Sequence, residues 1–167
     1  MQFFCYHRDR EGSTPLRASM TEEHWSYMDR FELVARGPTF ADDETLSGSV
    51  HVVELPDVAS ARAFVFDEPC YRAGAYRDVL LRRTAWQVLD PTVGSGFLAI
   101  GFAERPAPDD GAPSSPAGVA GIGPLLSDDG ALVVGAAAVA ATEEAARAAL
   151  HGLTAVEVHL WERGGRR

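Results

Sequence analysis

The chain has 167 residues, 46% of them apolar, which is enough for one globular domain or for two small halves that share a core. Its formal net charge of -9 argues against nucleic acid as a partner, because an acidic protein repels phosphate backbones. No apolar run approaches the ~20 residues of a membrane helix, so we expect no membrane insertion.

The cysteines and the start of the chain favour a reducing compartment. Cys5 and Cys70 form no CxxC pair, and the short apolar start at residues 1–6 is followed at once by charged residues. Neither feature is typical of a secreted protein. We therefore expect a cytoplasmic protein in which both cysteines are small core residues.

The elements predicted in the first half alternate between strands and helices. A capping-box sequence at 19–22 predicts the start of a helix whose apolar stripe continues to about Arg36. Gly37 and Pro38 would end this helix, and Asp57 is expected to cap a second one. The remaining predictions are a strand at 3–7, a hairpin turn at 42–44, a strand at 48–55, a helix at 58–66 and a strand at 76–81. This order is the β-α-β-β-α-β plan of ferredoxin-like folds.

Several segments of the first half recur in the second half in the same order. The sequence at 37–43 (GPTFADD) is echoed at 123–129 (GPLLSDD), and the helix at 58–63 is echoed at 143–148. Chance similarity between alanine-rich helices is the alternative. We interpret the pattern as a tandem repeat, with one unit at 1–90 and a degenerate unit at 91–167.

The second unit is expected to lack two features of the first. In place of the helix that carries His24 it has a connector at 105–120, whose Pro, Gly and Ser content is incompatible with an amphipathic helix. It also has no segment like Asp67–Tyr76 before its last strand. A site with a set of candidate catalytic residues is therefore predicted in the first unit alone.

Three segments of the first unit resemble the YciI-like (YCII-related) proteins: residues 22–28 (EEHWSYM), Gly37-Pro38 and residues 66–76 (FDEPCYRAGAY). Those proteins are similar to muconolactone isomerase and the chloromuconolactone dehalogenases of the dimeric α/β-barrel superfamily. The resemblance covers about residues 1–86. It implies an α+β fold of antiparallel sheets, in which the ferredoxin-like tandem repeat forms a pseudo-dimeric α/β barrel within one chain. Such a chain would be a monomer or would pair again as a homodimer.

The same resemblance implies that His24 pairs with an acid from the segment before Pro69. Both Asp67 and Glu68 qualify, because Glu68 and not an aspartate directly precedes the proline. An imidazole can take up and return a proton near neutral pH, and a buried carboxylate can fix its tautomer. From the residues alone, the alternative is a structural histidine at a helix edge that a nearby acid satisfies.

Other polar residues are candidates for binding a substrate. Arg72, next to Tyr71, could hold a carboxylate through two hydrogen bonds, although a surface arginine is the alternative. His7 and His51 lie in predicted strands, and either could point into the barrel, depending on the register. No ligand-spaced histidine pair such as HxH and no nucleotide-binding or hydrolase motif occurs, so we expect neither a metal nor a cofactor.

These observations predict a cofactor-independent lyase or isomerase that acts on a small organic metabolite by dehydration, dehalogenation or lactone isomerisation. His24 would be the general acid and base, with Glu68 or Asp67 as its partner. The alternative is a non-catalytic protein that binds a small ligand or stabilises an assembly, because a degenerate second half could fill the interior.

Overall fold

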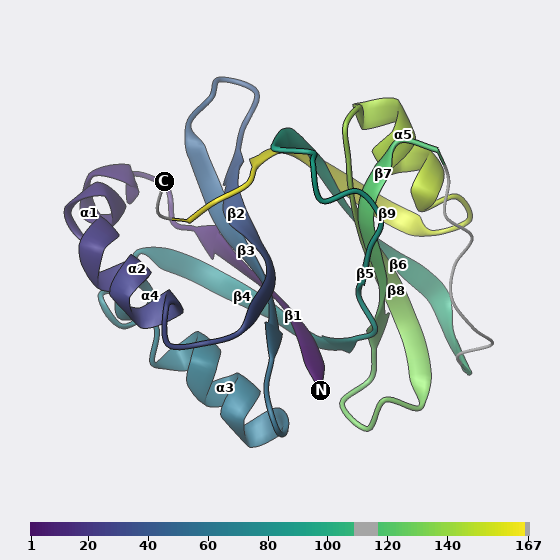
Figure 1. Ribbon diagram of the computed structural model, residues 1–167, viewed down its shortest axis with the longest axis horizontal. Coiled ribbons are helices and arrows are strands. Elements are labelled where there is room, and N and C mark those ends of the chain that lie inside the picture. Colours follow the sequence, from purple (N-terminus) through teal and green to yellow (C-terminus); the bar gives the residue numbers. More distant parts are fainter. Residues whose placement is uncertain (109–116, 166–167) are drawn as a thin grey trace. The chain divides into compact units, whose positions relative to one another are not determined.

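A computed structural model describes residues 1–108 and 117–165 (Figure 1). The chain divides into two compact units, Met1–Leu81 with the chain end from Gly164, and Arg82–Arg163. Each unit combines an antiparallel sheet with helices, which confirms the predicted α+β class. Within the described residues, no helix has the length and apolar character required to span a membrane.

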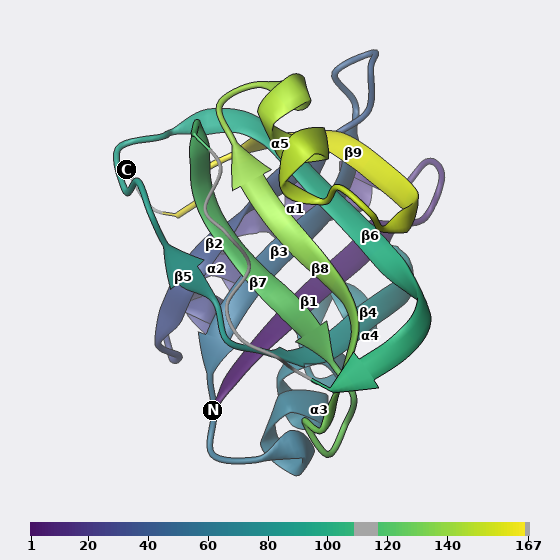
Figure 2. The same cartoon turned by 90° about the vertical axis from the view of Figure 1, so that its right-hand side faces the viewer.

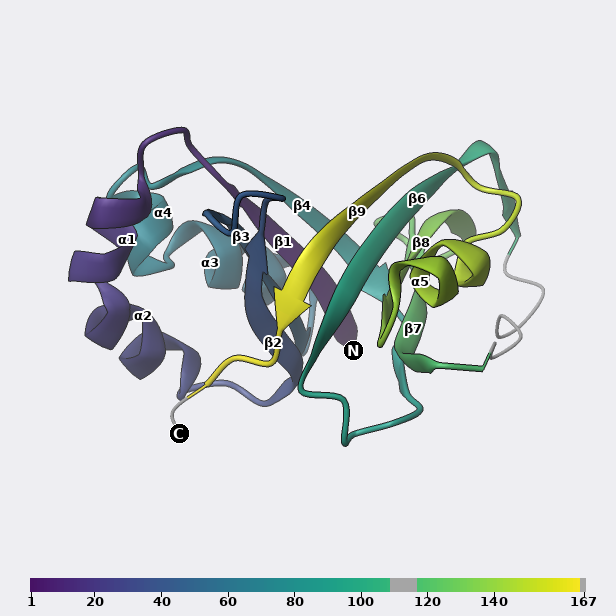
Figure 3. The same cartoon turned by 90° about the horizontal axis from the view of Figure 1, so that it is seen from above.

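The first unit has the ferredoxin-like strand order β4-β1-β3-β2. Its helices lie on one face of this sheet (Figures 1 and 3). The elements in chain order are β1 (Gln2–Asp9), α1 (Thr14–Ser19), α2 (Thr21–Met28), β2 (Leu33–Phe40), β3 (Leu46–Glu54), α3 (Val58–Phe66), α4 (Pro69–Arg72) and β4 (Tyr76–Thr84).

The second unit repeats this topology as β9-β6-β8-β7, with the short β5 outside β7. Figure 2 shows α5 on one face of its sheet. The equal strand order agrees with a tandem repeat, whose predicted division at residues 90 and 91 stays a prediction. Part of the connector predicted at 105–120 lies in β6, and positions 109–116 are outside the described residues. The elements are β5 (Gln87–Val88), β6 (Ser95–Pro108), β7 (Val119–Leu126), β8 (Leu132–Ala140), α5 (Glu143–Ala149) and β9 (Thr154–Glu162).

The two hairpin turns match residue by residue. The Asp43 side chain accepts the backbone N–H two residues later at 3.1 Å, and Asp129 does the same at 3.0 Å. The next position is left-handed in both turns, with φ of 64° at Glu44 and 77° at Gly130. Glycine suits this backbone, whereas glutamate occupies it under strain. The shared geometry places the turn predicted at 42–44 and the turn at Asp128 and Asp129 at equivalent points of the two units.

The helices that follow the hairpins begin with equivalent caps. The carboxylate of Asp57 accepts the N–H of Ser60 at 2.7 Å, and the hydroxyl of Thr142 accepts the N–H of Ala145 at 3.2 Å. The predicted helix at 58–66 and its cap are therefore both confirmed.

The prediction of one helix from the capping box to Arg36 is wrong. α2 ends at Met28, and Gly37 and Pro38 lie inside β2, where they pair with β3. Phe31 continues the helical stripe of α2 because it packs against the same core, although it lies beyond the end of the helix. The sheet partner thus overrides the local periodicity.

The capping box itself does not form. The hydroxyl of Ser19 donates to the carbonyl of Leu16 at 2.8 Å, and Met20 occupies the N-cap position of α2 without a side-chain bond. A preceding helix, α1, contains the serine instead, in a stretch for which no helix was predicted.

The core of the first unit fixes which strand residues face the helices. Phe3 and Cys5 of β1 and Val53 of β3 pack with Phe64 of α3. Because side chains alternate across a strand, His7 lies on this helix-side face of β1, and His51 lies on the same face of β3. The register thus places both histidines beside the helices, not on the opposite face of the sheet.

Candidate active site

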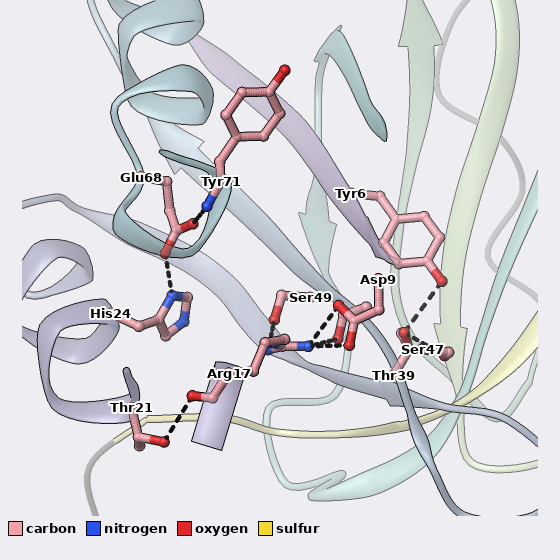
Figure 4. A network of polar contacts seen from close by, with 11 residues as sticks. Tyr6, Asp9, Arg17, Thr21, His24, Thr39, Ser47, Ser49, Glu68 and Tyr71 are labelled. Atoms are coloured by element: carbon pink, nitrogen blue, oxygen red, sulfur yellow. Dashed lines mark hydrogen bonds and ion pairs between the residues drawn. The ribbon is translucent and has the colours of Figure 1, made fainter. Parts of the chain in front are cut away.

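A hydrogen bond joins His24 of α2 to Glu68, which caps α4 (Figure 4). The distance from His24 Nδ1 to Glu68 Oε1 is 2.7 Å. The other carboxylate oxygen, Oε2, accepts the backbone N–H of Tyr71 at 2.7 Å. The Glu68 side chain has no exposed area, whereas the imidazole keeps 14% of its own. A buried acid therefore holds a histidine that solvent can still reach.

The protonation of this pair follows from its bonds. Burial disfavours the charge of Glu68, but the hydrogen bond and charge of His24 and two backbone N–H bonds outweigh burial, and the pKa of Glu68 lies below its ordinary value. An ionised carboxylate only accepts, so the proton of a neutral His24 sits on Nδ1. Nε2 then carries a lone pair, and among the described residues no group hydrogen-bonds to it.

The two candidate acids differ in position. Asp67 ends α3 and its side chain is exposed, whereas Glu68 turns inward as the N-cap residue of α4. Pro69 at the first position of α4 suits this start, because proline fixes the helical φ and needs no N–H partner there. The cap geometry thus gives the contact with His24 to Glu68 and leaves Asp67 outside it.

His7 and His51 extend the site across the sheet. Their ring centroids are 6.2 Å apart, and that of His51 is 5.7 Å from that of His24. Nε2 of His7 donates to the carbonyl of Val65 at 3.1 Å, and its Nδ1 is buried without a partner. Burial lowers the pKa of His7 to about 4, so this imidazole is neutral at physiological pH. The structure therefore brings three predicted histidines together.

A buried ion pair beside these histidines was not predicted. Arg17 of α1 binds both carboxylate oxygens of Asp9 at 2.9 Å and the hydroxyl of Ser49 at 2.6 Å (Figure 4). Its guanidinium also lies 5.3 Å from the ring centroid of Tyr76. The sequence contained a partial signal, since Asp9 follows Cys5 and His7 at alternate positions. The arginine was missed because no helix was predicted for its segment.

The remaining predicted residues are less involved. Tyr71 contributes its backbone N–H to Glu68, and its ring centroid lies 6.1 Å from that of His7. Arg72 is exposed, and its side chain makes no polar contact with residues 1–108 or 117–165. Its role as an anion anchor stays a prediction.

One group of described residues offers a set of possible metal ligands. Ligand atoms of His24, Glu68 and Cys70 lie within 4.8 Å of one another, and nitrogen, oxygen and sulfur ligands together suit zinc. Two of these residues are already hydrogen-bonded to each other, and burial raises the pKa of Cys70 to about 12, so its thiol is neutral. The expectation of no metal stays a prediction.

Comparison with known proteins agrees with the fold. The YCII-related domain family matches residues 1–85, just over half of the chain, and no curated protein matches. A 5-chloro-2-hydroxyhydroquinone dehydrochlorinase from Burkholderia phenoliruptrix AC1100, solved with 2,5-dihydroxybenzoquinone, is 27% identical, with coverage of 50% of this chain and 92% of its own and a TM-score of 0.46. A "putative monooxygenase" from Lactobacillus acidophilus NCFM is 9% identical, with coverage of 97% and 93% and a TM-score of 0.50. The second likeness concerns the fold alone.

Proposed function

The chain belongs to the YCII-related domain family, and we propose that it is a cofactor-independent lyase or isomerase of a small organic molecule. His24 is its general base and acid, and Glu68 orients the imidazole. The hydrogen bond of 2.7 Å between His24 and the fully buried Glu68 carries this proposal. Membership of the family indicates the fold, whereas the proposed reaction depends on the geometry of His24 and Glu68.

The reaction begins with proton transfer to Nε2 of His24. A substrate C–H or O–H bond breaks, an N–H bond forms, and the electron pair moves into the substrate. The imidazolium is stabilised by the charge of Glu68, which stays ionised. His24 then returns the proton to another atom in an isomerisation, or to a departing oxygen in a dehydration. In a dehalogenation the electron pair expels halide, and the proton leaves to solvent.

The proposal is tested with a panel of lactones, hydroxy acids and halogenated hydroxyquinones, each followed by NMR for disappearance of substrate. For a compound that is turned over, His24→Ala should lower kcat by about 10²–10⁴, the range of general acid–base catalysis. His151→Ala is a matched control, because this histidine is exposed in the second unit.

Two results would contradict the proposal. The first is unchanged turnover in a folded His24→Ala protein, with folding checked by circular dichroism. The second is that panel compounds raise the melting temperature but none reacts, which would instead favour the ligand-binding alternative.

A further inference from the structure

The imidazole of His51 is buried in β3. The residue is 2% exposed, and among the described residues its buried Nδ1 has no hydrogen-bond partner. A buried polar group without a partner costs about 1–3 kcal/mol, so native proteins retain few of them. Packing alone therefore does not explain why a histidine occupies this position.

The second unit shows that the scaffold does not need this histidine. His51 faces Cys5 in the register of the first unit, and Ala138 faces Ala99 at the equivalent point of the second. Ala138 is also fully buried. In the second unit, where no site is predicted, a methyl group thus fills the same sheet position. The imidazole is specific to the first unit.

His51 lies where it can meet a molecule held by His24. Its ring centroid is 5.7 Å from that of His24 and 5.9 Å from that of Phe64. Burial above all, with the charges of Arg17 and Arg36 acting in the same direction, keeps the pKa of His51 well below its ordinary value. The ring is therefore neutral, with one N–H to donate.

From the burial, the missing partner of Nδ1 and the ring geometry, we propose that His51 is a catalytic residue of the same reaction. It donates an N–H to the substrate oxygen on which charge develops when His24 removes a proton. The substrate class is a small molecule with a carbonyl, enol or phenol oxygen next to the reacting bond. This inference rests on the proposed function of His24.

The proposed step needs no external electron donor or acceptor. The substrate C–H bond breaks, Nε2 of His24 gains the proton, and the electron pair moves through the adjacent carbon onto oxygen as an enolate. His51 keeps its proton and strengthens its hydrogen bond as the oxygen becomes negative, as neutral donors do in oxyanion sites. The pair then returns from oxygen to expel a leaving group or to accept the proton at another carbon.

An enolate or phenolate oxygen fits these residues better than a carboxylate does. Both oxygens of Asp9, the hydroxyl of Ser49 and the carbonyl of Gly48 already occupy Arg17. A carboxylate would need a cation that is not engaged in this way, and that role stays a prediction for the exposed Arg72. One neutral donor suffices for an oxygen that is uncharged when it binds and becomes negative during the reaction.

The test uses 4-nitrophenol, whose absorbance distinguishes bound phenolate from phenol, with benzoate as the carboxylate probe. Wild-type protein should bind the phenolate form preferentially. His51→Ala, which mimics Ala138, should bind it about tenfold more weakly, the effect of one hydrogen bond, with benzoate unaffected. His51→Gln keeps an N–H donor and should restore part of the binding. His159→Ala, in the second unit, is the control.

Equal phenolate affinity of wild type and His51→Ala would overturn the inference, and so would absence of phenolate binding by wild type. If His51→Ala fails to fold, the comparison of His51→Gln with wild type decides, with near-equal affinity expected and a loss as large as tenfold contradicting a donor role. The binding measurement needs no turnover. Turnover that persists in His24→Ala therefore refutes the proposed function, whereas unchanged phenolate binding in His51→Ala refutes this inference alone.

Discussion

The two units of this chain share one scaffold and differ in the residues on the helix-side face of the sheet. Both have the strand order of a ferredoxin-like fold, the same turn after the second strand and a capped helix after the third. Gly37-Pro38 pairs with β3 in the same register in which Gly123-Pro124 pairs with β8. The scaffold therefore depends on turns, caps and register that both copies keep.

The difference lies at matched positions. His7 faces Ser49 in the first unit, and Gly101 faces Ala136 at the corresponding point of the second. The first unit adds α4, whose N-cap residue is Glu68, whereas only residues 150–153 separate α5 from β9. Side chains that the scaffold can replace by glycine and alanine are expected to serve function, and they gather around His24.

The largest effect is expected from Glu68→Gln. The glutamine keeps an oxygen for the N–H of Tyr71 but has no charge to stabilise the imidazolium of His24. We expect kcat on a panel compound to fall by about 10²–10⁴. Glu157→Gln is the matched control, because Glu157 lies 3.4 Å from His159 in the second unit. Equal losses of kcat in both variants would contradict a functional difference between the units.

Arg17→Met should destabilise the protein strongly, because it leaves Asp9 charged and buried. The side chains of this pair are 9% and 5% exposed. Removal of one partner of such a pair costs about 3–5 kcal/mol. Arg147→Met, which breaks an exposed pair in the second unit, should cost less than about 1 kcal/mol. Urea denaturation of the two variants measures the contrast, and similar midpoints would contradict it.

Acid should weaken the first unit before the second. Burial lowers the pKa of His7 from 6.5 to about 4, so between these pH values the unfolded chain binds a proton that the folded chain does not. This stability is complete above pH 6.5 and is lost as the pH falls towards 4, by about 3 kcal/mol. His51 acts in the same direction.

Hydrogen-exchange protection factors at several pH values measure this effect strand by strand. Protection of β1 and β3 should fall on acidification more than that of β6 and β8, where Gly101 and Ala138 replace the histidines. An equal loss in the two sheets would show that the buried histidines do not control acid stability.

The smallest effects should come from the two helix caps. Asp57→Ala and Thr142→Ala each remove one hydrogen bond to a backbone N–H at a helix start, and each should cost about 1 kcal/mol. Because α5 carries no site residue, Thr142→Ala should leave turnover unchanged. Thermal melting and kcat check both statements, and a loss of kcat in Thr142→Ala would extend the site into the second unit.

Local signals predicted much of this molecule. The Asp57 cap, the helix at 58–66 and the turn at 42–44 follow from short-range hydrogen bonds and were predicted correctly. The extension of the first helix to Arg36 was predicted wrongly, because Phe31 packs against the same core from beyond the end of α2. Pairing with β3 makes the segment before Arg36 a strand, and this pairing is a long-range contact that a local pattern does not contain.

The candidate site also depends on long-range contacts that local patterns do not contain. The sequence and its resemblance to a family selected His24 and two acids, but only the start of α4 at Pro69 separates Glu68 from Asp67. His7 and His51 were candidates whose facing depended on register, and the register places them beside α3. Arg17 was missed because α1 was not expected.

The central claim is that Glu68 fixes His24 as an Nδ1–H imidazole with a bare Nε2, and 15N NMR of the imidazole nitrogens tests it without a substrate. At about pH 8.5, where ordinary imidazoles are neutral, wild-type His24 should show the Nδ1–H tautomer. In Glu68→Gln this preference should weaken, while His159 in the second unit stays unchanged. An Nε2–H tautomer of His24 in the wild-type protein would contradict the account.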